Sequence, residues 1–235
     1  MLVKKKAPFI RGLIMALTFA IVLVVMFSPI FGGENALVAA DKLFNSIAKG
    51  STNYFPGLMK KTAEYANKTF DVSLKLKDKE MAGKATKLLT AAGAKVTGDG
   101  AEIKVTGDLG SVVSAALKDS EAMFNNREAE LSTRYGISGR EALYVWWNSF
   151  KEMEKDLTRQ KQFKEAAFLA EVLSKGIEVA YNFAKIIPES ASSRMGILSL
   201  SLIFYIIYTL WWGLAIMYLF EGLGLEMTAG TKKEV

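Results

Sequence analysis

The amino-acid sequence predicts an α+β membrane protein in which two transmembrane helices flank a mainly helical extracytoplasmic domain. Three observations predict this class. Residues 12–31 and 196–220 almost lack charged side chains, and each run is long enough to cross a hydrocarbon core of about 30 Å. Nearly all charged residues lie outside these two runs. Between the runs, apolar residues recur at helical spacing, interrupted by short alternating patterns that indicate a small sheet.

The basic residues of the two tails predict the orientation in the membrane. They stand close to the apolar runs, at Lys4, Lys5, Lys6, Arg11, Lys232 and Lys233. Because Lys and Arg in short flanks stay in the cytoplasm, we expect both termini there and the central domain outside. Short basic tails and the lack of an organelle-targeting pattern favour a prokaryotic plasma (inner) membrane, with the central domain periplasmic or extracellular.

This topology divides the chain into five segments. They are a cytoplasmic tail (1–11), a first transmembrane helix (12–32), an extracytoplasmic α+β domain (33–194), a second transmembrane helix (195–221) and a second cytoplasmic tail (222–235). A cleaved signal peptide is the alternative for the first segment, since Val38-Ala39-Ala40 resembles a cleavage site. The apolar run continues to Phe31 and exceeds the usual core of about 7–15 residues, which favours a retained anchor.

The second transmembrane segment carries polar and aromatic residues on one helical face. Their spacing is i, i+4, i+7 and i+11, at Ser201, Tyr205, Tyr208 and Trp212. Tyr and Trp usually lie at the membrane interfaces, and an unpaired hydroxyl in hydrocarbon costs free energy. This face is therefore expected to dock partner transmembrane helices or to line a lipid or quinone pocket. The alternative is packing against the first helix, with the serine bonding its own backbone.

Glu221 closes the second span. An ionisable side chain inside a membrane is a functional candidate by default. Its position at the end of the apolar run favours a simpler interpretation, a carboxylate in water at the cytoplasmic edge.

The first part of the central domain predicts a β-α-β-β-α unit over residues 69–134. Helices are expected over residues 34–49 and from Pro56 to 67, followed by an alternating strand over 70–77. A helix over 78–92 ends at Gly93, and two short strands across Gly98-Asp99-Gly100 indicate a β-hairpin. The next amphipathic helix begins near Asp108 or Ser111.

The second part predicts one long helix over residues 138–187. Ser138 and Glu141 form a capping box, apolar residues then step by three and four, and Pro188 ends the pattern. The stripe is interrupted over 158–162 without Gly or Pro, so the helix is expected to continue. This helix would either pack its apolar stripe into the core of the domain or form a stalk that binds a partner. Trp146 and Trp147 point to different sides, so one of them is expected to be exposed and to dock a partner.

The composition excludes most catalytic chemistry. The chain has no Cys and no His, which rules out thiolate and Ser-His-Asp catalysis and the usual zinc and haem ligands. No acidic pair stands out, and the glycines near residues 98–110 do not fit a phosphate-binding loop. The central domain has no clustered basic face, which argues against nucleic-acid binding. No enzyme activity, cofactor or metal site is therefore expected.

Three functions fit these observations. The favoured one is a non-catalytic, membrane-anchored accessory or scaffold subunit whose partners are other integral membrane subunits or further copies of the chain, together with membrane lipid. An extracytoplasmic ligand sensor is the second, although residues 222–235 are too few for a folded output domain. A lipid- or quinone-binding membrane protein is the third.

Overall fold

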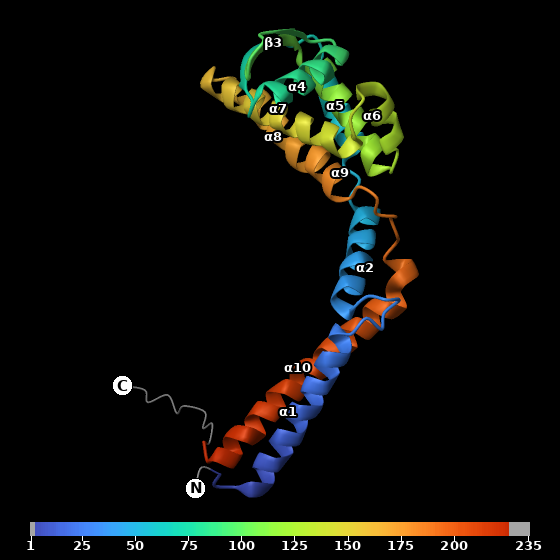
Figure 1. Cartoon of the computed structure of the whole chain (residues 1–235), viewed down its shortest axis with the longest axis vertical. Helices are drawn as coiled ribbons and strands as arrows, with labels where there is room; N and C mark the ends of the chain where they lie inside the picture. Colours follow the sequence, from blue (N-terminus) through green and yellow to red (C-terminus); the bar gives the residue numbers. More distant parts are fainter. Residues whose placement is uncertain (1–2, 226–235) are drawn as a thin grey trace, which may run out of the picture. The chain divides into compact units, whose positions relative to one another are not determined.

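The computed structural model describes residues 3–225, which form a mostly helical chain (71%) with a small three-stranded sheet (Figure 1). The described chain divides into two compact units. One comprises Met1–Ala48 with Glu189–Val235, and the other comprises Lys49–Pro188. Residues 33–48 and 189–194, which the expected topology assigned to the outer domain, thus cluster with the two apolar helices. We call the first unit the anchor unit and the second the outer unit, after the topology that the sequence predicts.

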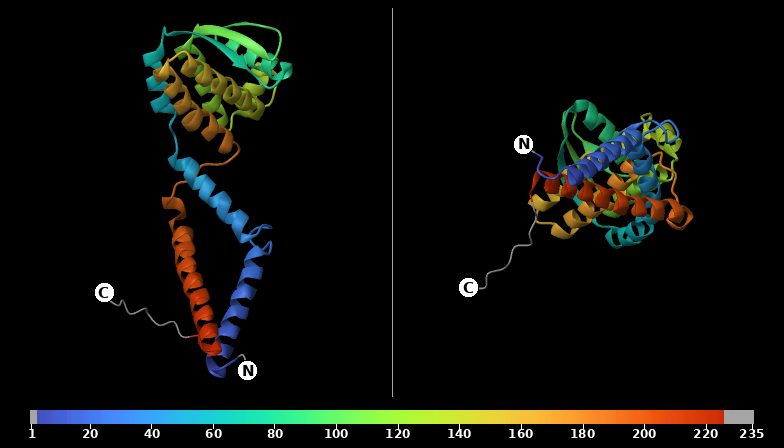
Figure 2. Two further views of the ribbon diagram at one scale, coloured as in Figure 1. Left: turned by 90° about the vertical axis from the view of Figure 1, so that its left-hand side faces the viewer. Right: turned by 90° about the horizontal axis from the view of Figure 1, so that it is seen from below.

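The anchor unit is built from α1 (Lys6–Phe27), the greater part of α2 (Ala36–Ser51), a short 3-10 turn η3 (Ser192–Arg194) and α10 (Met195–Leu223). α1 and α10 run antiparallel. Figure 2 shows them meeting where α1 begins and α10 ends, and diverging toward their other ends. Lys232 and Lys233, on which part of the expected orientation rests, lie outside the described residues.

α1 and α10 are long and apolar enough to span a membrane. α1 has 22 residues, which is about 33 Å at 1.5 Å per residue, and α10 has 29. A core helix of a soluble protein with this composition would be mostly buried, whereas most residues of both helices are exposed. They are therefore candidate membrane-spanning helices, although α1 also has the composition and place of a signal sequence.

The outer unit contains the predicted sheet. β1 (Thr69–Lys75), α4 (Lys79–Ala91), β2 (Lys95–Thr97), β3 (Glu102–Asp108) and α5 (Leu109–Phe124) follow one another in the expected β-α-β-β-α order. The strands are antiparallel in the order β1-β3-β2, with Val72 opposite Val105 and Leu74 opposite Ile103. These four side chains are buried, while their neighbours along the strands face outward, as the alternating sequence predicts.

The turn between β2 and β3 confirms the predicted hairpin. Gly98 has φ +116°, and a Cβ at this position would lie 2.8 Å from the carbonyl oxygen of Glu102. The position therefore requires glycine. Three shorter elements complete this part of the fold: α3 (Phe55–Thr62), the 3-10 turn η1 (Ala63–Tyr65) and α6 (Glu128–Tyr135).

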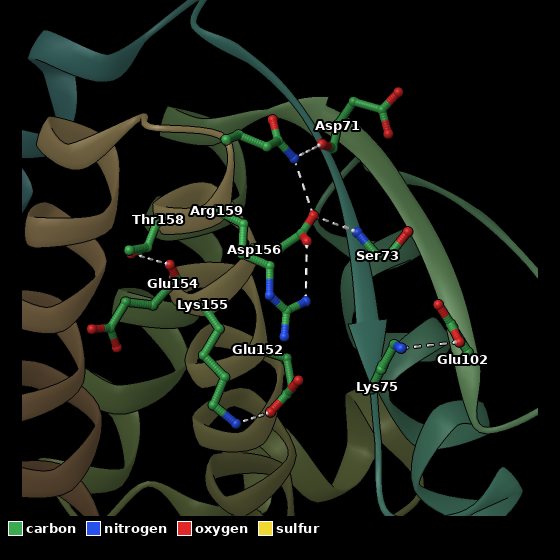
Figure 3. Close-up of polar contacts among 11 residues, drawn as sticks. Asp71, Ser73, Lys75, Glu102, Glu152, Glu154, Lys155, Asp156, Thr158 and Arg159 are labelled. Carbon is green, nitrogen blue, oxygen red and sulfur yellow. Dashed lines mark hydrogen bonds and ion pairs between the residues drawn. The ribbon is translucent and has the colours of Figure 1, made fainter.

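The free edge of β1 is covered by side chains from α7 (Gly139–Arg159) (Figure 3). The backbone N–H of Ser73 donates to Oδ2 of Asp156 at 3.0 Å. Gln160, just beyond the helix, donates from Nε2 to the carbonyl oxygen of Asp71 at 2.7 Å. Because an uncovered edge invites pairing with another chain, these two contacts close this side of the sheet.

The prediction of a single long helix over residues 138–187 is wrong. The segment forms α7, α8 (Phe163–Val172), a π-helical turn η2 (Leu173–Ile177) and α9 (Glu178–Asn182). The chain reverses at Lys161, which has a left-handed φ of 62°, so that α8 packs back along α7 (Figure 1). The apolar stripe is interrupted over 158–162 because its two parts belong to two helices, which pack against each other, while α7 also packs on β1. This interruption was the local signal of the reversal, and it was not decisive because no Gly or Pro accompanies it.

Candidate partner-docking sites

α1 and α10 pack closely through small residues. Gly12, Ala215 and Gly222 are buried, and a Cβ at Gly12 would lie 2.7 Å from the backbone nitrogen of Leu219. A Cβ at Gly222 would lie 2.6 Å from Cα of Phe9. Small residues let two helix backbones approach in this way, which is how helices associate in membranes without a hydrophobic driving force.

An aromatic cluster extends this contact along the helices. The ring of Phe19 lies 4.3 Å from that of Tyr208 and 4.6 Å from that of Trp212, measured between centroids. Trp211 donates from Nε1 to the carbonyl oxygen of Met15 at 3.1 Å. The indole N–H is thus paired inside the helix contact, so it is not left as a donor without an acceptor.

The predicted polar face of α10 is consequently divided. Tyr208 and Trp212 contact α1 through Phe19, as the intramolecular alternative expected. Ser201 and Tyr205 lie beyond this contact, and Ser201 bonds its own helix at the carbonyl oxygen of Ile197 (2.8 Å). The side of Tyr205 is open: the residue is 64% exposed, and its hydroxyl has no hydrogen-bond partner within residues 3–225.

Glu221 lies at the end of α10, where the start of α1 meets it. Its carboxylate is 3.7 Å from Nζ of Lys5, and both side chains are partly exposed. The backbone N–H groups of Lys4 and Lys5 donate to the carbonyl oxygen of Gly222, each at 2.9 Å. Glu221 thus helps to join the end of α10 to the start of α1.

Trp146 is a core residue and is unavailable to a partner. It is fully buried, and its Nε1 donates to Oδ2 of Asp119 at 2.9 Å. Asp119 also accepts from the hydroxyl of Tyr135 at 2.6 Å and from Arg134 at 2.5 Å. Burial is the main cause that raises the pKa of Tyr135, and the hydrogen bond to Asp119 raises it further. This network joins α5, α6 and α7, so of the two tryptophans only Trp147 can be the exposed one that the sequence predicts.

Trp147 points to the other side of α7 and is only partly buried. It lines a pocket of about 310 Å³ between α7 and the segment η2–α9, which we call the aromatic groove. The groove is formed by Leu143, Tyr144, Trp147, Ile177, Glu178, Tyr181 and Asn182. Leu143 and Ile177 are buried at its base, while Tyr144 is exposed at its rim.

The rings of the groove are held in place by neighbouring side chains. Tyr144 stacks on Trp147 with 6.3 Å between centroids and 8° between ring planes. Trp147 donates from Nε1 to Oε1 of Glu178 at 2.8 Å, and Nζ of Lys151 lies 4.4 Å from the centroid of its ring. Arg140 covers the ring of Tyr181, with Cζ 4.5 Å from the centroid. Stacked rings with a paired N–H form a rigid apolar surface.

Sequence reasoning missed most of this groove. The signal was available on α7, where Arg140, Tyr144, Trp147 and Lys151 follow the i, i+4, i+7, i+11 spacing of one helical face. The contribution of Tyr181 and Glu178 had no such signal, because their approach depends on the unexpected reversal at Lys161. Within residues 3–225, the structure groups no three acidic residues in a way that would hold a metal ion.

Comparisons with known proteins give no assignment. The chain matches no protein-family model, and neither a similar curated protein nor a similar solved structure was found. The geometry of α10 and of the aromatic groove is therefore the basis for a functional proposal.

Proposed function

We propose that this chain is a non-catalytic accessory or scaffold subunit of a larger membrane protein complex. It would be anchored by α1 and α10 in a plasma (inner) membrane, and it would dock integral membrane partners along α10. The observation that carries this proposal is the open side of Tyr205, which is 64% exposed on a part of α10 that α1 does not cover. In hydrocarbon, the hydroxyl of Tyr205 is stabilised when a neighbouring helix supplies an acceptor.

The meeting of the helix ends supports the expected orientation. The start of α1 and the end of α10 are joined through the carbonyl oxygen of Gly222. If both helices span the bilayer, both ends lie on one side, and the basic residues before α1 place that side in the cytoplasm. The outer unit would then be periplasmic or extracellular.

The packing of α1 also favours a retained anchor over a cleaved signal peptide. Cleavage would remove the segment against which Gly222, Ala215 and Trp211 are packed. It would leave the indole of Trp211 without its acceptor. The lipid- or quinone-binding alternative has less support. Tyr208 and Trp212 would line such a pocket, but their rings already pack against the ring of Phe19.

The test is a comparison of two hydroxyl deletions. Tyr205→Phe removes the open hydroxyl, and Tyr208→Phe removes one on the side that faces α1. Site-specific photo-crosslinking from Leu202, one turn away and 61% exposed, reports the neighbouring helix in native membranes. We expect Tyr205→Phe to reduce crosslinking to a partner protein several-fold, and Tyr208→Phe to leave it unchanged. Crosslinking to lipid alone in the unmodified chain would contradict the proposal.

A further inference from the structure

Arg140 and Lys151, the two cations beside the aromatic groove, differ in their hydrogen bonds from the other cations that lie over aromatic rings. In residues 3–225, five cations lie over aromatic rings. Three of them, Lys49, Lys61 and Arg134, also donate hydrogen bonds to oxygen atoms. Arg140 and Lys151 have no such acceptor within the described chain. Their N–H donors are therefore free to bind an anion while the rings hold the side chains in place.

We propose that the aromatic groove binds an acidic, amphipathic segment of a partner protein. An apolar side chain of the segment lies against Tyr144 and Trp147 over the buried base, and flanking carboxylates pair with Arg140 and Lys151. This inference deepens the proposed function, on which it rests, by assigning a second docking site to the outer unit.

Charge at the rim favours an acidic segment over a basic one. Glu178 is the single acidic residue of the lining, and it already accepts the indole N–H of Trp147. This neutral N–H does not cancel the charge of Glu178, so Arg140 and Lys151 together with Glu178 leave a net charge of +1 at the groove. A segment rich in Lys or Arg would meet this net charge as a like charge, which lowers affinity and slows association.

The lining favours a protein segment over a small polar ligand. The base of the groove consists of the apolar side chains of Leu143 and Ile177, which suit an apolar side chain and give a sugar or nucleotide no hydrogen-bonding group there. Trp, Tyr and Arg are the residues that dominate binding energy at protein interfaces. Because the rings are already stacked and bonded, binding would immobilise few additional side chains, which preserves affinity.

The first experiment places a photo-crosslinking amino acid at Tyr144 of the full chain in native membranes. Tyr54 is the matched control, because it is 46% exposed against 45% for Tyr144 and lies outside the groove. We expect a protein crosslink from Tyr144 and not from Tyr54, at a peptide with an apolar residue flanked by Asp or Glu. A crosslinked peptide without carboxylates, equal crosslinking from both positions, or none from Tyr144 would overturn the proposal.

The second experiment uses the crosslinked peptide, synthesised and labelled, as the probe for binding to the purified full chain. Arg140→Glu combined with Lys151→Glu should weaken binding by about tenfold or more, and substituting Lys for the peptide's acidic residues should restore it. Lys87→Glu combined with Lys118→Glu, two exposed positions outside the groove, should leave affinity unchanged. Equal effects of the two double variants, or no rescue by the basic peptide, would contradict charge-specific docking.

Failure of this inference is distinguishable from failure of the proposed function. If Leu202 crosslinks a membrane partner while Tyr144 crosslinks none, docking along α10 stands and the groove proposal falls. If Tyr144 captures an acidic segment while Leu202 contacts lipid alone, the groove stands and the intramembrane docking falls.

Discussion

Trp146 donates its indole N–H to Asp119 across the contact between α5 and α7, and both side chains are buried. Asp119 receives two further hydrogen bonds, from Tyr135 and Arg134 of α6. One carboxylate thus connects three helices of the outer unit. A buried carboxylate is tolerated when several donors surround it, and each donor would be left unpaired without it.

Asp119→Ala should destabilise the outer unit by about 2–4 kcal/mol, because it leaves two buried donors and one partly exposed guanidinium without an acceptor. The free energy of unfolding, measured by denaturant titration of the full chain in detergent, checks this value. Asp99→Ala is the control, because Asp99 is exposed between β2 and β3. Equal stability of the two variants would show that the network is dispensable.

Gly12→Leu should separate α1 from α10, because its side chain would overlap the backbone at Leu219 and Ala215. Overpacking of this kind costs about 1–3 kcal/mol. The absence of native Cys allows a clean assay, in which Cys residues at positions 5 and 221, outside the aromatic cluster, are joined by a short bis-maleimide. Gly213→Leu is the matched control, since a Cβ there meets nothing within 4 Å. Crosslinking should fall with Gly12→Leu and persist with Gly213→Leu; the reverse order would refute the packing.

Lys161→Gly should leave the outer unit as stable as the parent or stabilise it by up to about 1 kcal/mol. The left-handed backbone at Lys161 costs a residue with a side chain about 1–2 kcal/mol, whereas glycine adopts it freely. Part of this gain is offset because glycine loses more conformational entropy than lysine when the chain folds. Lys155→Gly, in the interior of α7, should instead destabilise by about 1 kcal/mol. Denaturant titration measures the free energy of unfolding of both variants. An equal loss of stability in the two would indicate a continuous helix through Lys161 and would contradict the reversal.

Glu165→Gln should reduce the loss of stability on acidification. The hydrogen bond from Lys68 lowers the pKa of Glu165 below its ordinary value of 4.5. Its stabilising effect is therefore complete above pH 4.5 and is lost as the pH falls through the lower pKa of the folded chain. Unfolding free energies measured at pH 7 and near pH 3 should differ less for Glu165→Gln than for the parent. Glu64→Gln, at an exposed position, should behave as the parent does; a Glu165 variant with an unchanged pH dependence would contradict the assignment.

The sequence patterns predicted the sheet because β1 and β3 alternate cleanly between buried and exposed residues. The two apolar helices were equally clear from length and composition. The reversal at Lys161 was not predicted, since lysine rarely adopts a left-handed conformation and no Gly or Pro accompanies the interruption of the stripe. Because the reversal was not predicted, the aromatic groove was not predicted either, since its two walls come from helices on either side of the reversal.

The assignment of site residues failed for a related reason. Adjacent residues such as Trp146 and Trp147 point to different sides of a helix, but the sequence does not state which side meets the core. On α10, the spacing grouped Ser201, Tyr205, Tyr208 and Trp212 on one face. Only the position of Phe19 shows that α1 covers one half of that face and leaves the other open.

The most direct test of the central claim is the intact mass of the assembly extracted gently from native membranes, with every co-purifying chain identified. We expect a defined complex of this chain with other integral membrane subunits, and a loss of those subunits with Tyr205→Phe but not with Tyr208→Phe. A chain recovered alone, or only with copies of itself, would contradict the accessory-subunit assignment.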